Sequence, residues 1–420
     1  MKGPKIGLYA GSGTSHSWLW FVDLFEKAGF YDLVFLDEFS VQNNDIKVLD
    51  VLVISGGDTF AVAKSLGKKG GQNIKSFVEQ GGTYIGSCAG AYLPMNSSKK
   101  PLDWFNFVDV KITNLSKTLP LAEITTSKFC TSYGCDFVFH PVREAVALKT
   151  TSFFDKETPI AFTAPLYGGP GMKACDPSWV LAVYEGFTSK TSFLTSREIA
   201  EKTLVNNAAV IRVPYKKGCF YLLGPHLEHP KFKEANQFII DAVISESCMV
   251  QNRGSSKYRL ESAPLKEKIT GKQAKELLLN IRRELSNSRI VAASLEFLPI
   301  QWLIGQKVYE PQKMRVYIES MWKRMRVLEK NKVLIFEPGL YERITSAACQ
   351  ITLELRRIKP QIDENLDSLE TAVKIFDLLH VLSSSFFDLY FETLFNGSQH
   401  YHEQYHEGVK SKVKIGNEIT

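Results

Sequence analysis

In the first half of the chain, short continuous runs of apolar residues alternate with segments whose apolar residues recur every three or four positions. The continuous runs predict buried strands, and the recurring positions predict amphipathic helices. We expect strands at 5–10, 33–36 and 51–55 and helices at 15–28, 60–66 and 73–80. Buried strands that alternate with helices are typical of a parallel sheet covered on both faces. The pattern therefore predicts an α/β fold, with the ligand-binding loops at the carboxyl ends of the strands.

Between Pro101 and Tyr215 the pattern shifts toward strands and loops. Apolar runs predict further strands at 145–148, 179–184 and 208–213. A glycine-rich segment, 166–172, lies among them and reads either as a loop near a ligand or as a surface turn.

Beyond residue 247 the composition changes to a polar segment followed by helical periodicity. We predict a domain at 1–247, a linker at 248–265, a helical domain at 266–396 and a flexible tail at 397–420. The expected helices are 270–285, opened by a capping box of Thr270 and Gln273, then 311–330, 340–359, stopped by Pro360, and 362 to about 395. Their apolar stripes predict a bundle core rather than a cofactor site.

The segment from Gly82 to Pro94, GTYIGSCAGAYLP, contains a strand-turn-helix pattern around Cys88. The G-x-C-x-G spacing is that of a nucleophile elbow, in which flanking glycines let the strand and helix approach closely. The start of a helix also lowers the cost of a thiolate. The alternative is a buried cysteine in an ordinary turn.

A second candidate lies after the strand expected at 220–223, where His226 and Glu228 follow within the sequence GPHLEHP. A cysteine nucleophile needs an imidazole to accept its proton and a carboxylate to orient that imidazole. His226 and Glu228 supply both groups. For the neighbouring His229, a solvent-facing or capping role is expected instead.

Together these motifs resemble the class I glutamine amidotransferase superfamily and, more narrowly, the amidotransferase-like domain at the N-terminus of biotin protein ligases, over residues 4–245. The resemblance implies a flavodoxin-like, doubly wound, mostly parallel sheet. It implies a catalytic triad of Cys88, His226 and Glu228, and an oxyanion hole formed by the backbone N–H groups of Gly57 and Ala89. The residues that it implies for substrate binding are Gly56, Tyr92, Tyr167, Gly168 and Gly169.

The chain departs from that superfamily at two positions. Tyr92 stands where glutamine-using members commonly carry glutamine, and Ser55 replaces a proline before the glycine pair. We also find no acceptor domain for ammonia and no biotinyl-adenylate loop. The sequence therefore weakens the expectation of glutamine hydrolysis and predicts no biotin transfer.

Composition limits the functions and cellular locations that are consistent with the sequence. The chain has 420 residues, 44% of them hydrophobic, and a net charge of +6, which permits anionic ligands without requiring nucleic acid. Seven irregularly spaced cysteines argue against a disulfide framework and for a reducing, cytoplasmic location. The first residues predict a strand rather than a signal peptide, and no run is long enough to span a membrane.

Other motifs favour ordinary structural roles. The turn at 11–14 lacks the third glycine of a dinucleotide fingerprint, and Cys130, Cys135 and His140 lack a fourth zinc ligand. The basic run 323–326 is expected to be a solvated helix face, and His400, His402 and His406 to lie in the tail. We predict no metal and no cofactor.

Two hypotheses remain. The first is a cysteine-dependent amidohydrolase or amidotransferase acting on a small-molecule or peptide amide. The second is a non-catalytic regulatory or ligand-binding module whose helical domain offers a surface to a protein partner.

Overall fold

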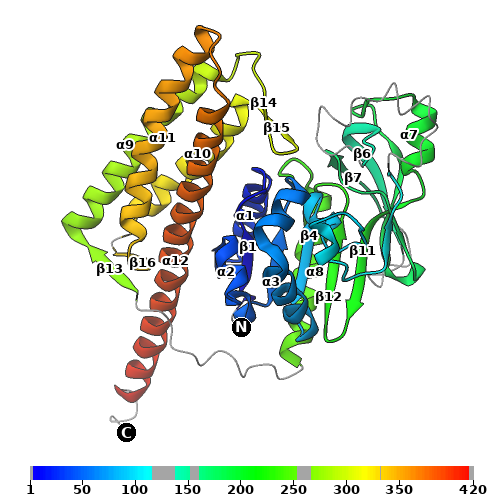
Figure 1. Ribbon diagram of the computed structural model, residues 1–420. Coiled ribbons are helices and arrows are strands. Elements are labelled where there is room, and N and C mark those ends of the chain that lie inside the picture. The colour runs from blue at the N-terminus through cyan, green and yellow to red at the C-terminus, as the bar shows by residue number, and fades with distance from the viewer. Residues whose placement is uncertain (1–2, 116–137, 152–159, 253–265, 332, 416–420) are drawn as a thin grey trace.

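The computed structural model describes residues 3–115, 138–151, 160–252, 266–331 and 333–415 (Figure 1). Its α/β part is built on parallel strands at the positions where continuous apolar runs predicted them. These are β1 (Ile6–Tyr9), β2 (Leu33–Leu36), β3 (Val51–Ile54), β4 (Thr83–Ser87) and β12 (Gly218–Leu223). They are ordered β2-β1-β3-β4-β12, and each neighbouring pair is parallel.

The same sheet continues beyond β12 as antiparallel strands. They are β11 (Ala208–Tyr215), β9 (Val180–Phe187), β6 (Val142–Thr150), β7 (Ala161–Leu166), β10 (Ser192–Phe193), β8 (Met172–Ala174) and β5 (Val110–Ile112). Short connections such as the one between β11 and β12 allow only antiparallel neighbours, because a parallel pair needs a longer crossover. The α/β fold predicted from the sequence is confirmed, and its sheet is mixed, with the antiparallel strands following β12.

Helices cover both faces of the parallel strands. Leu8, Val53 and Ile85 point into one apolar cluster, with α1 (Trp18–Lys27) and α8 (Lys233–Asn252). Alternate strand residues such as Leu52 and Tyr84 point into the other. The helices on that side are α2 (Glu38–Gln42) and α3 (Thr59–Glu79). Two-sided burial explains why these strands read as continuous apolar runs.

Two helices predicted at 60–66 and 73–80 are joined in α3. The chain bends at Gly67, whose backbone has φ 62° and ψ −176°, and helical structure resumes directly after it. The remaining short helices are α4 (Ala89–Tyr92) in the elbow and α7 (Arg197–Leu204) before β11.

The C-terminal region is helical, as predicted, with different boundaries. Its helices are α9 (Gly271–Leu295), α10 (Pro311–Glu329), α11 (Leu340–Asp363) and α12 (Leu369–Ile415). Thr270 precedes α9 but its side chain makes no cap hydrogen bond, so the predicted capping box is wrong. Pro360 does not stop α11, which continues to Asp363. A proline removes only one N–H donor, and here the helix extends less than one turn beyond it.

Two predicted boundaries are also wrong. Helix α8 extends to Asn252, into the expected linker, and α12 extends past residue 395 into the expected tail. No proline occurs between Pro360 and the end of α12, and a single glycine such as Gly397 lowers helix stability without ending the helix.

Short strand pairs within the helical region have no counterpart in the predictions. β13 (Glu267–Thr270) pairs with β16 (Val333–Phe336), and β14 (Trp302–Ile304) forms a hairpin with β15 (Lys307–Tyr309). Strands of three or four residues are too short to show a period of two.

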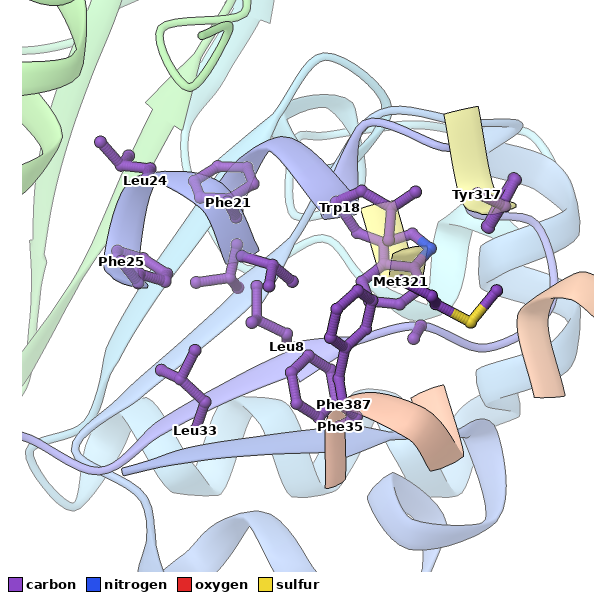
Figure 2. Packing of buried hydrophobic residues seen from close by; sticks show 14 of the residues in the cluster. Leu8, Trp18, Phe21, Leu24, Phe25, Leu33, Phe35, Tyr317, Met321 and Phe387 are labelled. Atoms are coloured by element: carbon purple, nitrogen blue, oxygen red, sulfur yellow. The ribbon is translucent and has the colours of Figure 1, made fainter. Parts of the chain in front are cut away.

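The helical region packs against α1 and against β2, which is the edge strand of the sheet. Figure 2 shows Trp18 and Phe35 of the α/β part facing Phe387 of α12, with Tyr317 and Met321 of α10 nearby. The rings of Phe35 and Phe387 lie 5.6 Å apart. The aromatic segment of α12 therefore docks onto the α/β part.

An ion-pair cluster lies at the same interface. It includes two residues of the basic run 323–326, so the prediction that this run is a solvated helix face is wrong for them. Arg324 is 2% exposed, and its guanidinium contacts Asp23 at 2.8 Å and Glu26 at 2.5 Å. Lys323 also pairs with Asp23, at 2.5 Å. These two cations bind α1, whose acidic groups cannot be located from the local sequence of α10.

In the described part of the chain, no helix is both long enough and apolar enough to cross a bilayer.

Candidate active site

Cys88 lies in the sharp turn between β4 and α4. Its backbone has φ 51° and ψ −105°, a conformation that a non-glycine residue rarely adopts. A Cβ at Gly86 would lie 2.2 Å from the carbonyl oxygen of Gly90, and a Cβ at Gly90 would lie 1.9 Å from that of Ile54. Both glycines of the G-x-C-x-G pattern are therefore required by packing, and the backbone is strained at the proposed nucleophile.

His226 and Glu228 follow β12, the parallel neighbour of β4, which brings them beside Cys88. The imidazole Nδ1 of His226 lies 2.6 Å from Oε1 of Glu228, and the thiol of Cys88 hydrogen-bonds the same ring. Ser87 donates its hydroxyl to both carboxylate oxygens of Glu228, at 3.0 Å each. All four side chains are buried.

Charge coupling within this cluster favours a thiolate–imidazolium pair. Burial alone would raise the pKa of Cys88, but the charge and the hydrogen bond of His226 outweigh it and lower that pKa. Burial alone would lower the pKa of His226, but the charges of Glu228 and Cys88 raise it to about 9. Because α4 is only one turn long, His226 and not the helix terminus is the main source of thiolate stabilisation.

The backbone N–H groups of Gly57 and Ala89 have no acceptor within the described residues, and both residues line the cavity beside Cys88. Gly57 cannot be replaced without a clash, since a Cβ there would lie 2.1 Å from the carbonyl oxygen of Gly13. Two unused donors next to a nucleophile are what an oxyanion hole requires.

A cavity of about 560 Å³ opens in front of Cys88. Tyr92, Tyr167 and Gly168, three of the residues that the resemblance implied for substrate binding, line it. Gly56 and Gly169 do not. A Cβ at Gly56 would meet the imidazole of His226 at 2.6 Å, and one at Gly169 would meet Gly224 at 1.7 Å. These two glycines allow close packing beneath the site instead of contacting the cavity.

Sequence reasoning missed several residues around the triad. The indole ring of Trp20 on α1 lies 5.4 Å from the ring of His226 and 4.6 Å from that of His229. Asn114 hydrogen-bonds the hydroxyl of Tyr92 at 3.2 Å, and that hydroxyl donates to the carbonyl of Gly168 at 3.2 Å. No motif marks these residues, because they meet the site only through folding.

Gln306 and Lys307 of the helical region also line the cavity. Their position more than 200 residues after Cys88 gave no sequence signal. The cavity beside Cys88 is therefore shared between the α/β part and the helical region.

No group of three or more metal-ligating side chains occurs among the described residues. Cys130 and Cys135 lie outside them. His140 lines the cavity, and burial, with the charges of Lys307 and Arg143 adding, lowers its pKa to about 4, so its ring is neutral at pH 7.

Comparison with solved structures finds only distant likeness. A ThuA-like protein from Bacteroides uniformis is 14% identical, with a TM-score of 0.33, over 58% of this chain and 91% of that one. An exo-β-1,4-mannosidase from Opitutaceae bacterium strain TAV5 is 12% identical, with a TM-score of 0.27, over 60% of this chain and 36% of that one. A β-galactosidase from Bacillus circulans is 11% identical, with a TM-score of 0.30, over 60% of this chain and 31% of that one. No curated protein matches the sequence.

The family comparison is more specific. The model described as biotin-protein ligase, N terminal, matches residues 6–102, which contain Gly57, the elbow and Cys88. The matched segment ends before β12, so it does not include His226 or Glu228. Residues 6–102 are thus similar to the N-terminal domain of biotin-protein ligases, the family that the motif around Cys88 predicted.

Proposed function

We propose that this protein is a cysteine-dependent amidohydrolase or amidotransferase, with Cys88, His226 and Glu228 as its triad. The observation that carries the proposal is the buried thiol–imidazole–carboxylate series on a strained elbow, with free backbone donors beside the thiol. A structural cysteine would need neither the strain nor the charge coupling.

The reaction would begin when the thiolate of Cys88 attacks the carbonyl carbon of an amide. The new C–S bond pushes the carbonyl electron pair onto oxygen, where the N–H groups of Gly57 and Ala89 stabilise it. The oxyanion then re-forms the C=O bond and the C–N bond breaks. His226 gives its proton to the departing nitrogen, which leaves as an amine, and the acyl group remains on Cys88 as a thioester.

Water, or an acceptor amine in the transferase case, completes the cycle. His226 removes a proton from that nucleophile as it attacks the thioester, and the C–S bond breaks to release the acid or new amide. Glu228, held by Ser87, keeps the proton on Nδ1 so that Nε2 exchanges protons with the reacting atoms.

The order β2-β1-β3-β4-β12 is the 2-1-3-4-5 order of flavodoxin-like sheets, and it supports assigning the α/β part to that fold. We also place the protein in the cytoplasm. Cys88, Cys175, Cys219, Cys248 and Cys349 are free thiols, in keeping with a reducing compartment.

The test is the pH dependence of Cys88 alkylation by iodoacetamide. We expect alkylation well below the pKa of an ordinary thiol, since the pKa of Cys88 is lowered. In His226→Ala the imidazole that lowers the pKa of Cys88 is lost while the thiol stays buried. The pH profile of the alkylation rate should therefore shift to alkaline pH. Cys88→Ser identifies the background from other thiols.

An alkylation profile that follows an ordinary thiol and ignores His226→Ala would refute the triad and favour the non-catalytic module. If Cys88 instead shows the expected alkylation at low pH, turnover of amides should disappear in Cys88→Ala while thermal stability is retained.

A further inference from the structure

The β14–β15 hairpin brings a cation from the helical region into the catalytic cavity. Gln306 stands in its two-residue turn and Lys307 begins β15, and both line the same cavity as Cys88. This part of the cavity lies outside the segment that matches biotin-protein ligase N-terminal domains, so the family comparison assigns it no role.

The hairpin is fixed at both ends. At its base, the indole N–H of Trp302 donates to Ser368 at 3.0 Å, and the rings of Tyr309 and Phe376 lie 4.6 Å apart. At its tip, the backbone N–H of Gln306 donates to Oδ2 of Asp58 at 2.8 Å. Gly305 has φ +61°, which a glycine at the first turn position adopts without strain. Lys307 is therefore presented to the cavity by a preorganised element.

The charge of Lys307 is not neutralised within the described parts of the chain, where no carboxylate forms an ion pair with it. Its field reaches buried groups on neighbouring segments. After burial and the charge of Lys313, Lys307 helps to hold the pKa of His16 well below its ordinary value. Burial lowers the pKa of Lys313 itself to about 8, and Lys307 adds to that shift.

Cations gathered around a partly dry cavity repel one another, and an anion placed between them removes that repulsion. Lys111 also lines the cavity from β5. Asp58 is the one carboxylate among the described residues that line the cavity, and the lysines Lys99, Lys111 and Lys307 outnumber it. An anionic ligand is therefore the complement of this electrostatic field.

The larger share of the wall is apolar. It includes Met95, Leu102, Ile112 and Val138, and the cavity volume of about 560 Å³ falls within the range of small-molecule sites. A ligand that fills the cavity would combine an apolar body with one acidic group.

We propose that Lys307 binds the carboxylate of the substrate, and that the substrate is a medium-sized amide with an apolar body and an acidic group. The amide part of this inference rests on the proposed function, whereas the anion site rests on the cavity and the hairpin alone. Lys307 is then a specificity-determining residue, contributed by a region that the family match does not cover.

The first test compares alkylation of Cys88 by iodoacetate, which is anionic, and iodoacetamide, which is neutral. We expect the iodoacetate-to-iodoacetamide rate ratio to fall about tenfold in Lys307→Met, to recover largely in Lys307→Arg, and to stay unchanged in Lys275→Met, an exposed lysine on α9. An equal ratio in wild type and Lys307→Met would overturn the proposal.

The second test needs no reactive thiol. Calorimetry should show octanoate binding to the full chain at least tenfold more weakly in Lys307→Met than in wild type, with octanamide bound equally by both. Octanoate binding that is absent in wild type, or unaffected by the substitution, would refute the anion site. Octanoate binding that depends on Lys307, combined with an ordinary Cys88 thiol, would refute the proposed catalysis and leave the anion site standing.

Discussion

At the residue scale, the site depends on a few buried polar contacts whose partners lie far apart in sequence. Ser87 and Glu228 are separated by 141 positions, yet the serine hydroxyl contacts both carboxylate oxygens. The pairing follows from β4 and β12 being parallel neighbours, in which Ser87 is opposite Leu223. A carboxylate held in this way keeps the imidazole of His226 oriented and charged.

Replacing Glu228 by Gln should lower the alkylation rate of Cys88 at pH 6 to 7 by about 10- to 100-fold, the change in thiolate population that corresponds to about one to two pKa units. Burial lowers the pKa of His226, and the charge of Glu228 is the largest of the opposing causes that together raise it to about 9. Removing that charge should bring the pKa of His226 down and depopulate the imidazolium, a loss that we expect to outweigh the direct effect of Glu228, which raises the pKa of Cys88. Rate measurements with iodoacetamide across pH 5 to 10 would follow both effects.

The matched control is Glu234→Gln, an exposed carboxylate on α8. A Glu228→Gln profile that superimposes on wild type would exclude an electrostatic role for this carboxylate.

At the element scale, the elbow is set by contacts between β3, β4 and α4. Its glycines leave room for neighbouring backbone carbonyls, and this close approach forces Cys88 to positive φ. The sequence predicted this turn from the G-x-C-x-G spacing alone, because glycine is the residue that tolerates such contacts.

We expect Gly90→Ala to lower the free energy of unfolding by at least about 3 kcal/mol, since its Cβ would overlap the carbonyl oxygen of Ile54. Urea denaturation followed by circular dichroism measures the change. Gly186→Ala in β9 meets no atom within 4 Å and serves as the control. Similar stabilities for the two variants would show that the elbow has room for a side chain.

At the scale of the whole molecule, the helical region is joined to the α/β part by an apolar interface and a buried charge cluster. The aromatic residues at the interface come from α1, β2, α10 and α12 (Figure 2). Arg324 adds directional contacts with Asp23 and Glu26. This interface fixes the position of the β14–β15 hairpin at the cavity.

Arg324→Gln should lower the free energy of unfolding by about 2 to 3 kcal/mol, because it leaves the partly buried carboxylates of Asp23 and Glu26 without their main partner. Hydrogen exchange should increase first in α1 and α10. The control is Arg326→Gln, two positions away and exposed. Equal effects of the two substitutions would mean that the cluster does not hold the two regions together.

The sequence by itself determined the parallel strands, the nucleophile turn and the His226–Glu228 pair, because each is encoded by local apolar runs, glycine spacing or neighbouring residues. Helix ends were less well determined, as Pro360 and the extension of α12 show, since a single residue changes helix stability only modestly. Only the tertiary structure brought Ser87, Trp20 and Lys307 to the site. These contacts depend on strand order and on the docking of the helical region, and no local pattern records either.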